Sequence, residues 1–243
     1  MASKTNPMKK IILFNFLFLV AFNINAQTED YNALLQKHVD EKGNVDYKNL
    51  KKEASKLTEY LSFLAKTTPQ KSWSGDKKKA FWINAYNAYT LKIILDNYPT
   101  KSIMKIKKKG KDAWNIPFAK VGGKNYTLNH IEHEILRKDF SDPRIHVGVN
   151  CASLSCPQLG NFAFTESNIE SELERLMKLF INDTSRNIIT EKKIQISKIF
   201  DWFKGDFIKN GSVIDYFNKY SDIKINKKAK IRYLEYNWNL NGK

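Results

Sequence analysis

The chain has 243 residues, of which 42% are hydrophobic and 13% aromatic, and its formal net charge at pH 7 is +16. So much apolar side chain excludes an intrinsically disordered protein, and the length suffices for one domain with a sizeable core. The positive charge favours an anionic partner, such as a component of the cell envelope. The basic residues are scattered lysines rather than an arginine–aromatic stripe, so no nucleic-acid partner is expected.

Residues 1–26 have the pattern of a signal peptide. Met1–Lys10 is basic, Ile11–Phe22 is almost entirely apolar, and Asn23–Ala26 ends in a small residue suited to cleavage. The apolar run is shorter than the roughly 20 residues that a membrane-spanning helix needs, which makes an uncleaved anchor the less favoured alternative. We therefore expect residues 27–243 to be one exported domain, periplasmic or secreted, without a transmembrane segment after cleavage.

Three helices are expected in the first hundred residues. Leucines at helical spacing predict helices over Glu29–Val39 and Lys48–Ala65. The longest helix begins at Ser74, runs to about Asn97 and ends before Pro99, which cannot continue a helix. Its apolar residues form two stripes on different faces, a pattern typical of a helix buried at the centre of a domain.

Two asparagines, Asn84 and Asn87, lie three residues apart on this central helix and are neighbours on its surface. A buried amide without a partner costs on the order of 1–3 kcal/mol, so both side chains need hydrogen bonds. They can tie nearby loops to the core, which is the favoured interpretation, or they can bind a substrate in a pocket.

A hairpin and a helix are expected next. Gly122–Gly123 lies between two short runs, Phe118–Val121 and Lys124–Thr127, and predicts a tight turn between two strands. A short helix is expected over Leu128–Arg137. The helical spacing places the following residues on one side of it: His130, His133, Glu134 and Arg137.

A strand is then expected to lead into the two cysteines. Ile145, Val147 and Val149 alternate with polar or small residues, which is the period of a strand, and the run ends at Cys151. After it, Ser167 with Glu170 predicts a capping box for a helix that ends near Ile181. The remaining expected elements are a hairpin of Asn187–Thr190 and Lys193–Ser197, an aromatic-rich segment at Ile199–Phe207, a helix at Val213–Tyr220 and a strand at Ile231–Tyr236.

Together these elements predict a single α+β domain, with a central buried helix and further helices around a small, mostly antiparallel sheet. Four stretches, taken together, resemble the domain of unknown function 547 family: FWINAYNAYTLKIIL (Phe81–Leu95), IEHEILR (Ile131–Arg137), RIHVGVNCASLSCPQL (Arg144–Leu159) and YLEYNWNLN (Tyr233–Asn241). The resemblance points to these residues: Asn84, Asn87, Glu132, His133, Arg137, His146, Cys151, Cys156 and Pro157. The closing motif of the family has Asp where this chain has Asn237. The family name assigns no activity.

Thiol catalysis is the first hypothesis for these residues. Cys151 would be the nucleophile of an acyl hydrolase or acyl transferase, with a histidine as its base and Glu132 or an asparagine to orient that histidine. The backbone N–H groups of a helical turn that follows Cys151 would lower its pKa. On an extended strand, His146 would lie about 15 Å from Cys151, because a strand rises about 3.3 Å per residue. His133 is therefore the favoured base and His146 a second candidate, while Asn84, Asn87 and Arg137 are candidates for substrate binding.

Two other hypotheses stay open. His133, His146, Cys151 and Cys156 form a Cys₂His₂ set suited to zinc, although the spacing of the cysteines is looser than in most zinc sites. Alternatively, Cys151 and Cys156 form a disulfide in an exported binding module without catalysis. The thiol hypothesis requires no cofactor.

Overall fold

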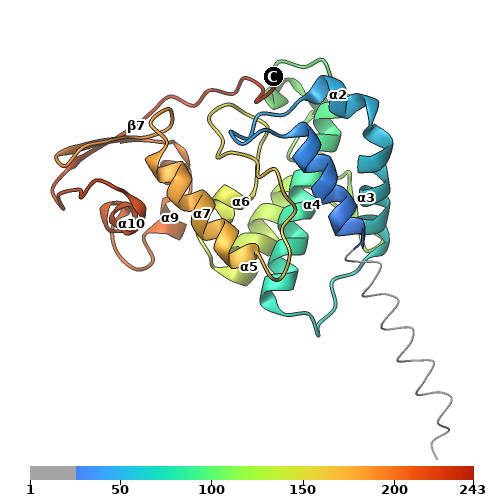
Figure 1. The fold of residues 1–243 in the computed structure, drawn as a ribbon, viewed down its shortest axis with the longest axis horizontal. Helices are drawn as coiled ribbons and strands as arrows, with labels where there is room; N and C mark the ends of the chain where they lie inside the picture. The colour runs from blue at the N-terminus through green and yellow to red at the C-terminus, as the bar shows by residue number, and fades with distance from the viewer. Residues whose placement is uncertain (1–25) are drawn as a thin grey trace, which may run out of the picture.

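The computed structural model describes residues 26–243 (Figure 1). The expected signal peptide therefore lies outside the described residues, except for Ala26. The described part is an α+β domain, which confirms the predicted class, and its helices surround one long central helix, α4 (Gly75–Asp96). Within residues 26–243, no helix has both the length and the apolar character needed to cross a membrane.

Apart from the first helix, α3 and α7, the other helices are short. A first helix spans residues 26–38. The remaining helical elements are α2 (Tyr47–Lys52), α3 (Ala54–Lys66), the 3₁₀ turn η1 (Ile103–Lys105), the π-helix η2 (His130–Leu136), α5 (Arg137–Phe140), α6 (Ile145–Gly148), α7 (Ile169–Asn182), α8 (Ile199–Trp202), α9 (Lys204–Phe207) and α10 (Val213–Tyr220).

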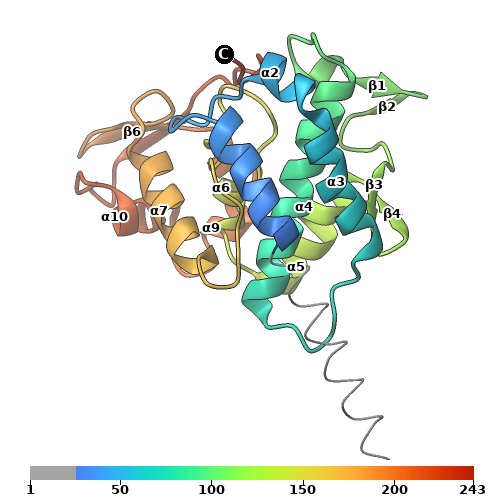
Figure 2. The same cartoon turned by 45° about the vertical axis from the view of Figure 1, so that its right-hand side comes forward.

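Helix α4 is buried along nearly its whole length, as its two apolar stripes predict. The Ser74 hydroxyl caps its first turn by accepting a hydrogen bond from the Lys77 N–H, at 3.1 Å. Helices α3 and α7 pack on different sides of it, and η2 and strand β3 (Ala119–Val121) also pack against it (Figure 2). Elements that approach from several directions leave few positions on α4 for polar side chains.

The strands form three small sheets rather than one. Antiparallel hairpins are formed by β1 (Lys107–Lys108) with β2 (Lys111–Asp112), and by β3 with β4 (Lys124–Tyr126). The β3–β4 hairpin is the one predicted around Gly122–Gly123, where both glycines have positive φ. The third sheet has the order β5 (Ile188–Ile189), β6 (Lys193–Ile196), β7 (Lys230–Tyr233), and its β6–β7 pair is parallel.

The prediction of a strand before the cysteines is wrong, because Ile145–Gly148 forms the short helix α6. All four residues of α6 are buried, so the alternation of side-chain types did not separate a core face from a solvent face. Gly148 permits this close packing, because a Cβ there would lie 3.0 Å from both the Ile83 Cδ1 and the Leu173 Cδ2. His146 is therefore on a helix and not on extended chain.

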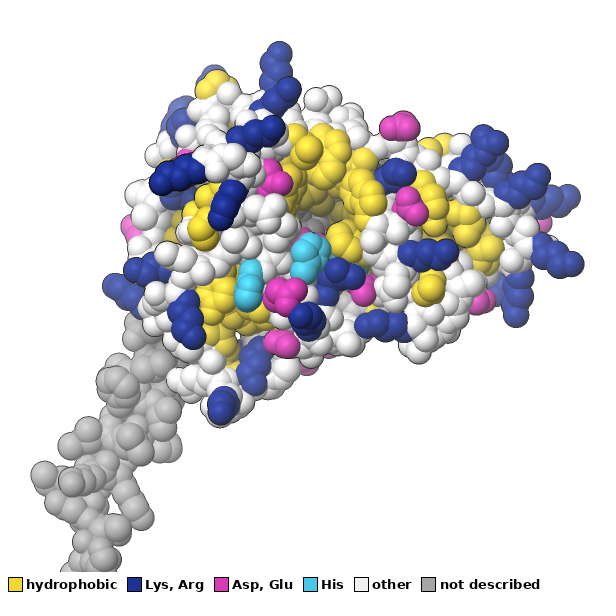
Figure 3. Space-filling view, turned by 180° about the vertical axis from the view of Figure 1, so that it is seen from behind, with side chains coloured by type: hydrophobic (Ala, Val, Ile, Leu, Met, Phe, Trp, Pro, Cys, Tyr) yellow, Lys and Arg dark blue, Asp and Glu magenta, His cyan; other side chains and the backbone are white. Residues whose placement is uncertain are grey.

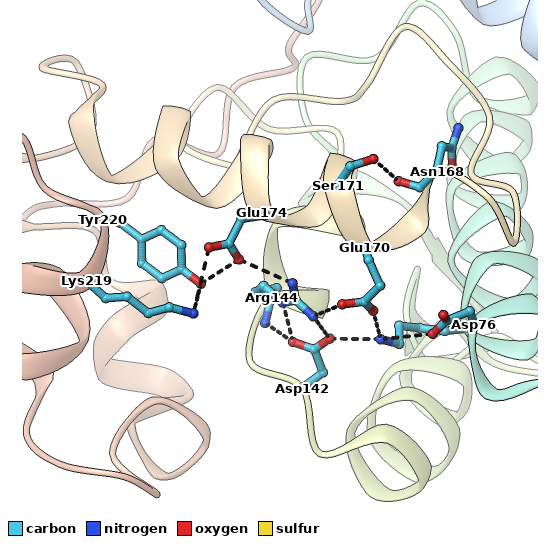
Figure 4. A network of polar contacts seen from close by, with 10 residues as sticks. Asp76, Asp142, Arg144, Asn168, Glu170, Ser171, Glu174, Lys219 and Tyr220 are labelled. Carbon is cyan, nitrogen blue, oxygen red and sulfur yellow. Dashed lines mark hydrogen bonds and ion pairs between the residues drawn. The ribbon is translucent and has the colours of Figure 1, made fainter.

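A network of charged side chains fixes the start of α6 between α4 and α7 (Figure 4). The buried Lys79 ammonium on α4 donates to Asp142 at 3.0 Å and to Glu170 of α7 at 2.6 Å. Arg144 donates to the same two carboxylates, at 2.9 Å and 2.6 Å, and lies 3.3 Å from Glu174. Because Lys79 is buried, its partners also neutralise a charge that would be costly alone. The network positions the loop from which His146 extends.

Two further expectations about helix boundaries are corrected. The predicted helix over Lys48–Ala65 is two helices, α2 and α3, that meet at Glu53. The expected capping box before α7 is absent, since Asn168 is the N-cap and makes no capping bond with its side chain. The Glu170 carboxylate is bound instead by Lys79 and Arg144.

Candidate functional site

A hollow of about 180 Å³ lies beside Cys151. Figure 3 shows the corresponding face, where the surface is hollowed among hydrophobic side chains and next to a histidine. The hollow is lined by Trp114, Asn129, Glu132, His133, His146, Val149, Cys151, Cys156, Ile199, Trp202, Phe203, Tyr236 and Trp238. The structure thus brings together the four residues proposed from the sequence as catalytic, namely Cys151, His133, Glu132 and His146.

Cys151 lies in a constrained loop directly after α6. Its N–H donates to the Cys156 sulfur at 3.1 Å, and its own sulfur lies 3.2 Å from both the Ser153 and the Tyr236 hydroxyls. The next residue, Ala152, has φ of +57°, a left-handed conformation that is uncommon for a residue other than glycine. The loop therefore holds the sulfur among three polar groups at the wall of the hollow.

Hydrogen bonds make Cys151 more acidic than an ordinary thiol. The Cys156 thiol, followed by the Ser153 and Tyr236 hydroxyls, lowers the pKa of Cys151 although burial opposes this change. Burial raises the pKa of Cys156, so Cys151 is the thiol that ionises first. The sequence hypothesis assigned the acidity of Cys151 to a following helix N-terminus, but no helix begins there.

His146 is oriented by an acid that sequence reasoning missed. Its Nε2 lies 2.8 Å from Oδ2 of Asp206, in α9, and its ring stacks on Phe203 with centroids 4.1 Å apart. The bonds from His146 and Arg137 hold the pKa of Asp206 well below its usual range. Because an ionised carboxylate only accepts hydrogen bonds, His146 Nε2 carries the proton and Nδ1 is the basic nitrogen. Burial lowers the pKa of His146, which keeps the ring neutral.

His133 has the opposite tautomer. Its Nδ1 lies 3.3 Å from Arg137 Nη1, and arginine can only donate, so Nδ1 accepts and Nε2 carries the proton. Burial, and then the Arg137 charge, lower the pKa of His133. Arg137 also donates to Asp206 at 2.7 Å, so it lies behind the histidines, and it does not line the hollow.

Residues 70–181 match a family model described as "Protein of unknown function, DUF547". The match confirms the resemblance noted from the sequence motifs. No curated protein and no solved structure matched the chain. The matched segment contains α4, η2, α6 and both cysteines, whereas Asp206, Tyr236 and Trp238 lie beyond its end.

The two asparagines on α4 bind loops and do not line the hollow. Asn87 accepts from the Asn150 N–H at 2.9 Å and donates to the Gly148 carbonyl at 2.8 Å. Asn84 makes the equivalent pair of bonds with the backbone of Phe164, at 2.9 Å and 2.7 Å. Asn87 therefore fixes the chain that leads from α6 to the cysteine loop.

Glu132 is a buried carboxyl group in the wall of the hollow. Burial raises its pKa to about 7, and a hydrogen bond with Tyr86 of α4 opposes that rise. When it is ionised, Glu132 raises the pKa of Cys151. The sequence hypothesis gave Glu132 the task of orienting the catalytic histidine, but for His146 that place is taken by Asp206.

The metal and disulfide hypotheses receive no support from the geometry. In the described part of the chain, no group of three or more His, Cys, Asp or Glu side chains is arranged to hold a metal ion. His146 points its Nε2 at Asp206 instead of at the cysteines. Cys151 and Cys156 are both free thiols, with Cys151 partly exposed and Cys156 buried.

A wall of large aromatic side chains completes the hollow, and sequence reasoning did not place it there. It consists of Trp114, Trp202, Tyr236 and Trp238, whose rings pack on one another with centroids 4.5–5.8 Å apart. The aromatic-rich segment at Ile199–Phe207 and the motif YLEYNWNLN were the available signals. Neither signal distinguishes a ring packed in the core from a ring facing a pocket.

Proposed function

We propose that this protein is a cysteine-dependent acyl hydrolase or acyl transferase acting on esters or amides. The observation that carries the proposal is the convergence on one hollow of an acidified thiol, Cys151, and a histidine held by an ionised acid, His146 with Asp206. A nucleophile, a base and a group that orients the base are the parts that covalent acyl transfer requires.

In the proposed reaction, His146 Nδ1 takes the proton of Cys151 and the sulfur attacks the substrate carbonyl carbon. The tetrahedral intermediate collapses, the carbon–leaving-group bond breaks, and His146 returns the proton to the leaving group. The resulting thioester is then attacked by water or another nucleophile, activated by the same histidine. Asp206 holds His146 in the required tautomer and stabilises its protonated form.

The negative oxygen of the intermediate needs hydrogen-bond donors. The Cys151 N–H already donates to Cys156, so we assign this role to the Nε2–H of His133 and to the Tyr236 hydroxyl. The sequence hypothesis made His133 the base. The tautomers favour His146 instead, because a ring whose Nδ1 accepts from Arg137 presents a proton to the hollow and not a lone pair.

Alkylation of the folded protein by iodoacetamide, followed by mass spectrometry, tests the acidified thiol. We expect Cys151 to be labelled below pH 7 and Cys156 only after unfolding. Complete absence of labelling in the folded protein would remove the proposal. If the thiol count is also zero, the disulfide-bearing binding module takes its place.

Hydrolysis of an activated ester, p-nitrophenyl acetate, tests the roles of the histidines. Cys151→Ser should abolish the burst of p-nitrophenol. His146→Ala should slow both acylation and thioester hydrolysis, whereas His133→Ala should slow acylation without shifting its pH profile. His130→Ala is the matched control, because His130 is on the same helix but outside the hollow. A loss of the acidic limb of the pH profile in His133→Ala, where the base becomes protonated, would restore His133 as the base.

We further propose that the protein is exported and that residues 1–26 are removed. The basic start, the apolar run and the small residue at Ala26 support this. N-terminal sequencing of the protein from the envelope or medium should begin at Gln27. Recovery of the chain from the cytoplasm with residues 1–26 still attached would contradict the proposal.

A further inference from the structure

The wall of the hollow is predominantly apolar and lies directly against the sulfur. The Tyr236 hydroxyl is 3.2 Å from the Cys151 sulfur, and the Tyr236 ring packs on both Trp202 and Trp238. Trp202 is 46% exposed, although it is one of the largest apolar side chains of the domain. Exposed aromatic surface that continues into a concave site is typical of a surface that binds an apolar group.

The charges around the hollow exclude an anionic group. Among the described residues that line it, none is a lysine or an arginine. Two guanidinium groups contact lining residues from outside the hollow, and both are bound elsewhere: Arg137 donates to Asp206, and Arg186 donates to the backbone carbonyls of Cys156 and Leu154. The charge present in the wall is that of Glu132, which burial keeps protonated up to about its pKa of 7 and which repels anions once ionised.

The arrangement of the rings also disfavours a bound cation. In an aromatic cage, the cation lies between ring faces, within about 6 Å of each centroid. Here the Tyr236–Trp238 and Trp202–Tyr236 centroids are only 4.5 Å and 4.8 Å apart, so these rings fill the space between one another. They form one continuous wall that presents an apolar surface on one side.

The position of the base indicates which part of a substrate meets this wall. His146 must protonate the leaving group, and its ring packs on Phe203. The sulfur itself contacts Tyr236, which belongs to the wall. A leaving group directed toward His146 therefore places the acyl group toward the Tyr236 side of the sulfur.

We propose that the hollow is an acyl pocket for an uncharged, apolar group of about six carbons or one aromatic ring, held against the wall of Trp114, Trp202, Tyr236 and Trp238. This inference rests on the proposed acyl-transfer function and names its substrate class. The volume of about 180 Å³ is close to that of an apolar cavity of about 150 Å³ that accepts benzene in another protein. A long acyl chain would have to extend beyond the hollow.

A series of p-nitrophenyl esters tests the pocket on the full chain. The hexanoate should be hydrolysed with a kcat/KM roughly 10- to 100-fold above that of the acetate, because each buried methylene adds to transition-state binding. Two six-carbon esters with a terminal charge, the adipate monoester and the 6-trimethylammonio-hexanoate, should be no better than the acetate. Equal rates for acetate and hexanoate, or preference for either charged ester, would overturn the inference while leaving the proposed function standing.

Substitutions in the aromatic wall test whether the wall causes the preference for the longer acyl group. Trp202→Ala removes a half-exposed ring of the wall and should reduce the ratio of hexanoate to acetate hydrolysis toward one. Trp73→Ala is the matched control, since Trp73 lines a different hollow whose lining includes neither cysteine. A ratio that stays high in Trp202→Ala and falls in Trp73→Ala would contradict the assignment.

Binding without turnover separates the inference from the function on which it rests. In Cys151→Ala, calorimetry should show that hexananilide, an uncharged six-carbon amide, binds at least ~10-fold more tightly than acetanilide. Trp202→Ala in the same background should remove the difference. If no ester is hydrolysed in a Cys151-dependent way but this difference is present, the acyl-transfer proposal fails and the apolar ligand class is supported. If hydrolysis occurs but the two anilides bind equally, the pocket assignment fails alone.

Discussion

Replacing Glu132 with glutamine measures the free energy of holding a carboxylate beside Cys151. The side chain is 7% exposed, and burial raises its pKa from 4.5 to about 7. In the unfolded chain the carboxyl group ionises near its ordinary value, so between these two pH values it loses its proton only on unfolding. The folded state is therefore destabilised progressively as the pH rises toward 7. At about 1.4 kcal/mol for each pKa unit, the full effect on the free energy of unfolding is about 3 kcal/mol.

Urea unfolding of the original chain and of Glu132→Gln between pH 4.5 and pH 8 provides the assay. The stability of the variant relative to the original chain should increase by about 3 kcal/mol from pH 4.5 to pH 7 and then stay constant. Glu134→Gln is the control, because Glu134 is exposed on the same helix and its ion pair with Lys138 lowers its pKa. A difference between Glu132→Gln and the original chain that does not change over this range would refute the reasoning.

Four further outcomes are expected. Above pH 7, Glu132→Gln should speed the alkylation of Cys151, because the ionised carboxylate raises the pKa of that thiol; at pH 5.5 the two rates should agree. Gly148→Ala should lower the free energy of unfolding in urea by about 1–3 kcal/mol through overpacking against Ile83. Asn87→Ala leaves two buried backbone groups without partners and should cost roughly 2–4 kcal/mol in the same assay. Asp206→Asn should reduce ester hydrolysis roughly 10²-fold while Cys151 is still alkylated, since it removes the group that orients the base.

The elements predicted correctly from the sequence are those with strong local signals. Helix α4 follows from its length, its Ser74 cap and the proline after it, and the β3–β4 hairpin follows from two consecutive glycines. Helix α6 was predicted as a strand because four buried residues are too few to distinguish a period of two from a period of 3.6. That error also produced the distance argument for His133 over His146, since an extended chain would have separated His146 from the thiol.

The sequence also identified some residues of the site and missed others. Cys151, His133 and His146 were found because the sequence has only four histidines and two cysteines, and Glu132 was found because it is next to His133. Asp206 was missed because it follows His146 by 60 positions and lies in an aromatic-rich segment whose sequence predicts only that it packs on the core. Its role depends on how α9 packs against α6, which is a property of the tertiary structure and not of either segment.

The residues that line the site come from two parts of the chain, the segment matched by the family model and the residues after it. The thiol, both histidines and Glu132 come from the segment matched by the DUF547 model, whereas Asp206 and most of the aromatic wall come from the residues after it. The C-terminal YLEYNWNLN stretch reaches back to the cysteine loop, where the Leu154 N–H donates to the Asn239 carbonyl at 2.8 Å. Asn237, which replaces the acid of the family motif, is exposed, and its side chain accepts from the Asn239 N–H at 3.0 Å. An aspartate could accept the same bond, so the replacement preserves the turn that presents Trp238 to the hollow. Under the proposed function, the matched segment would supply the nucleophile and its base, and the later residues would orient the base and select the acyl group.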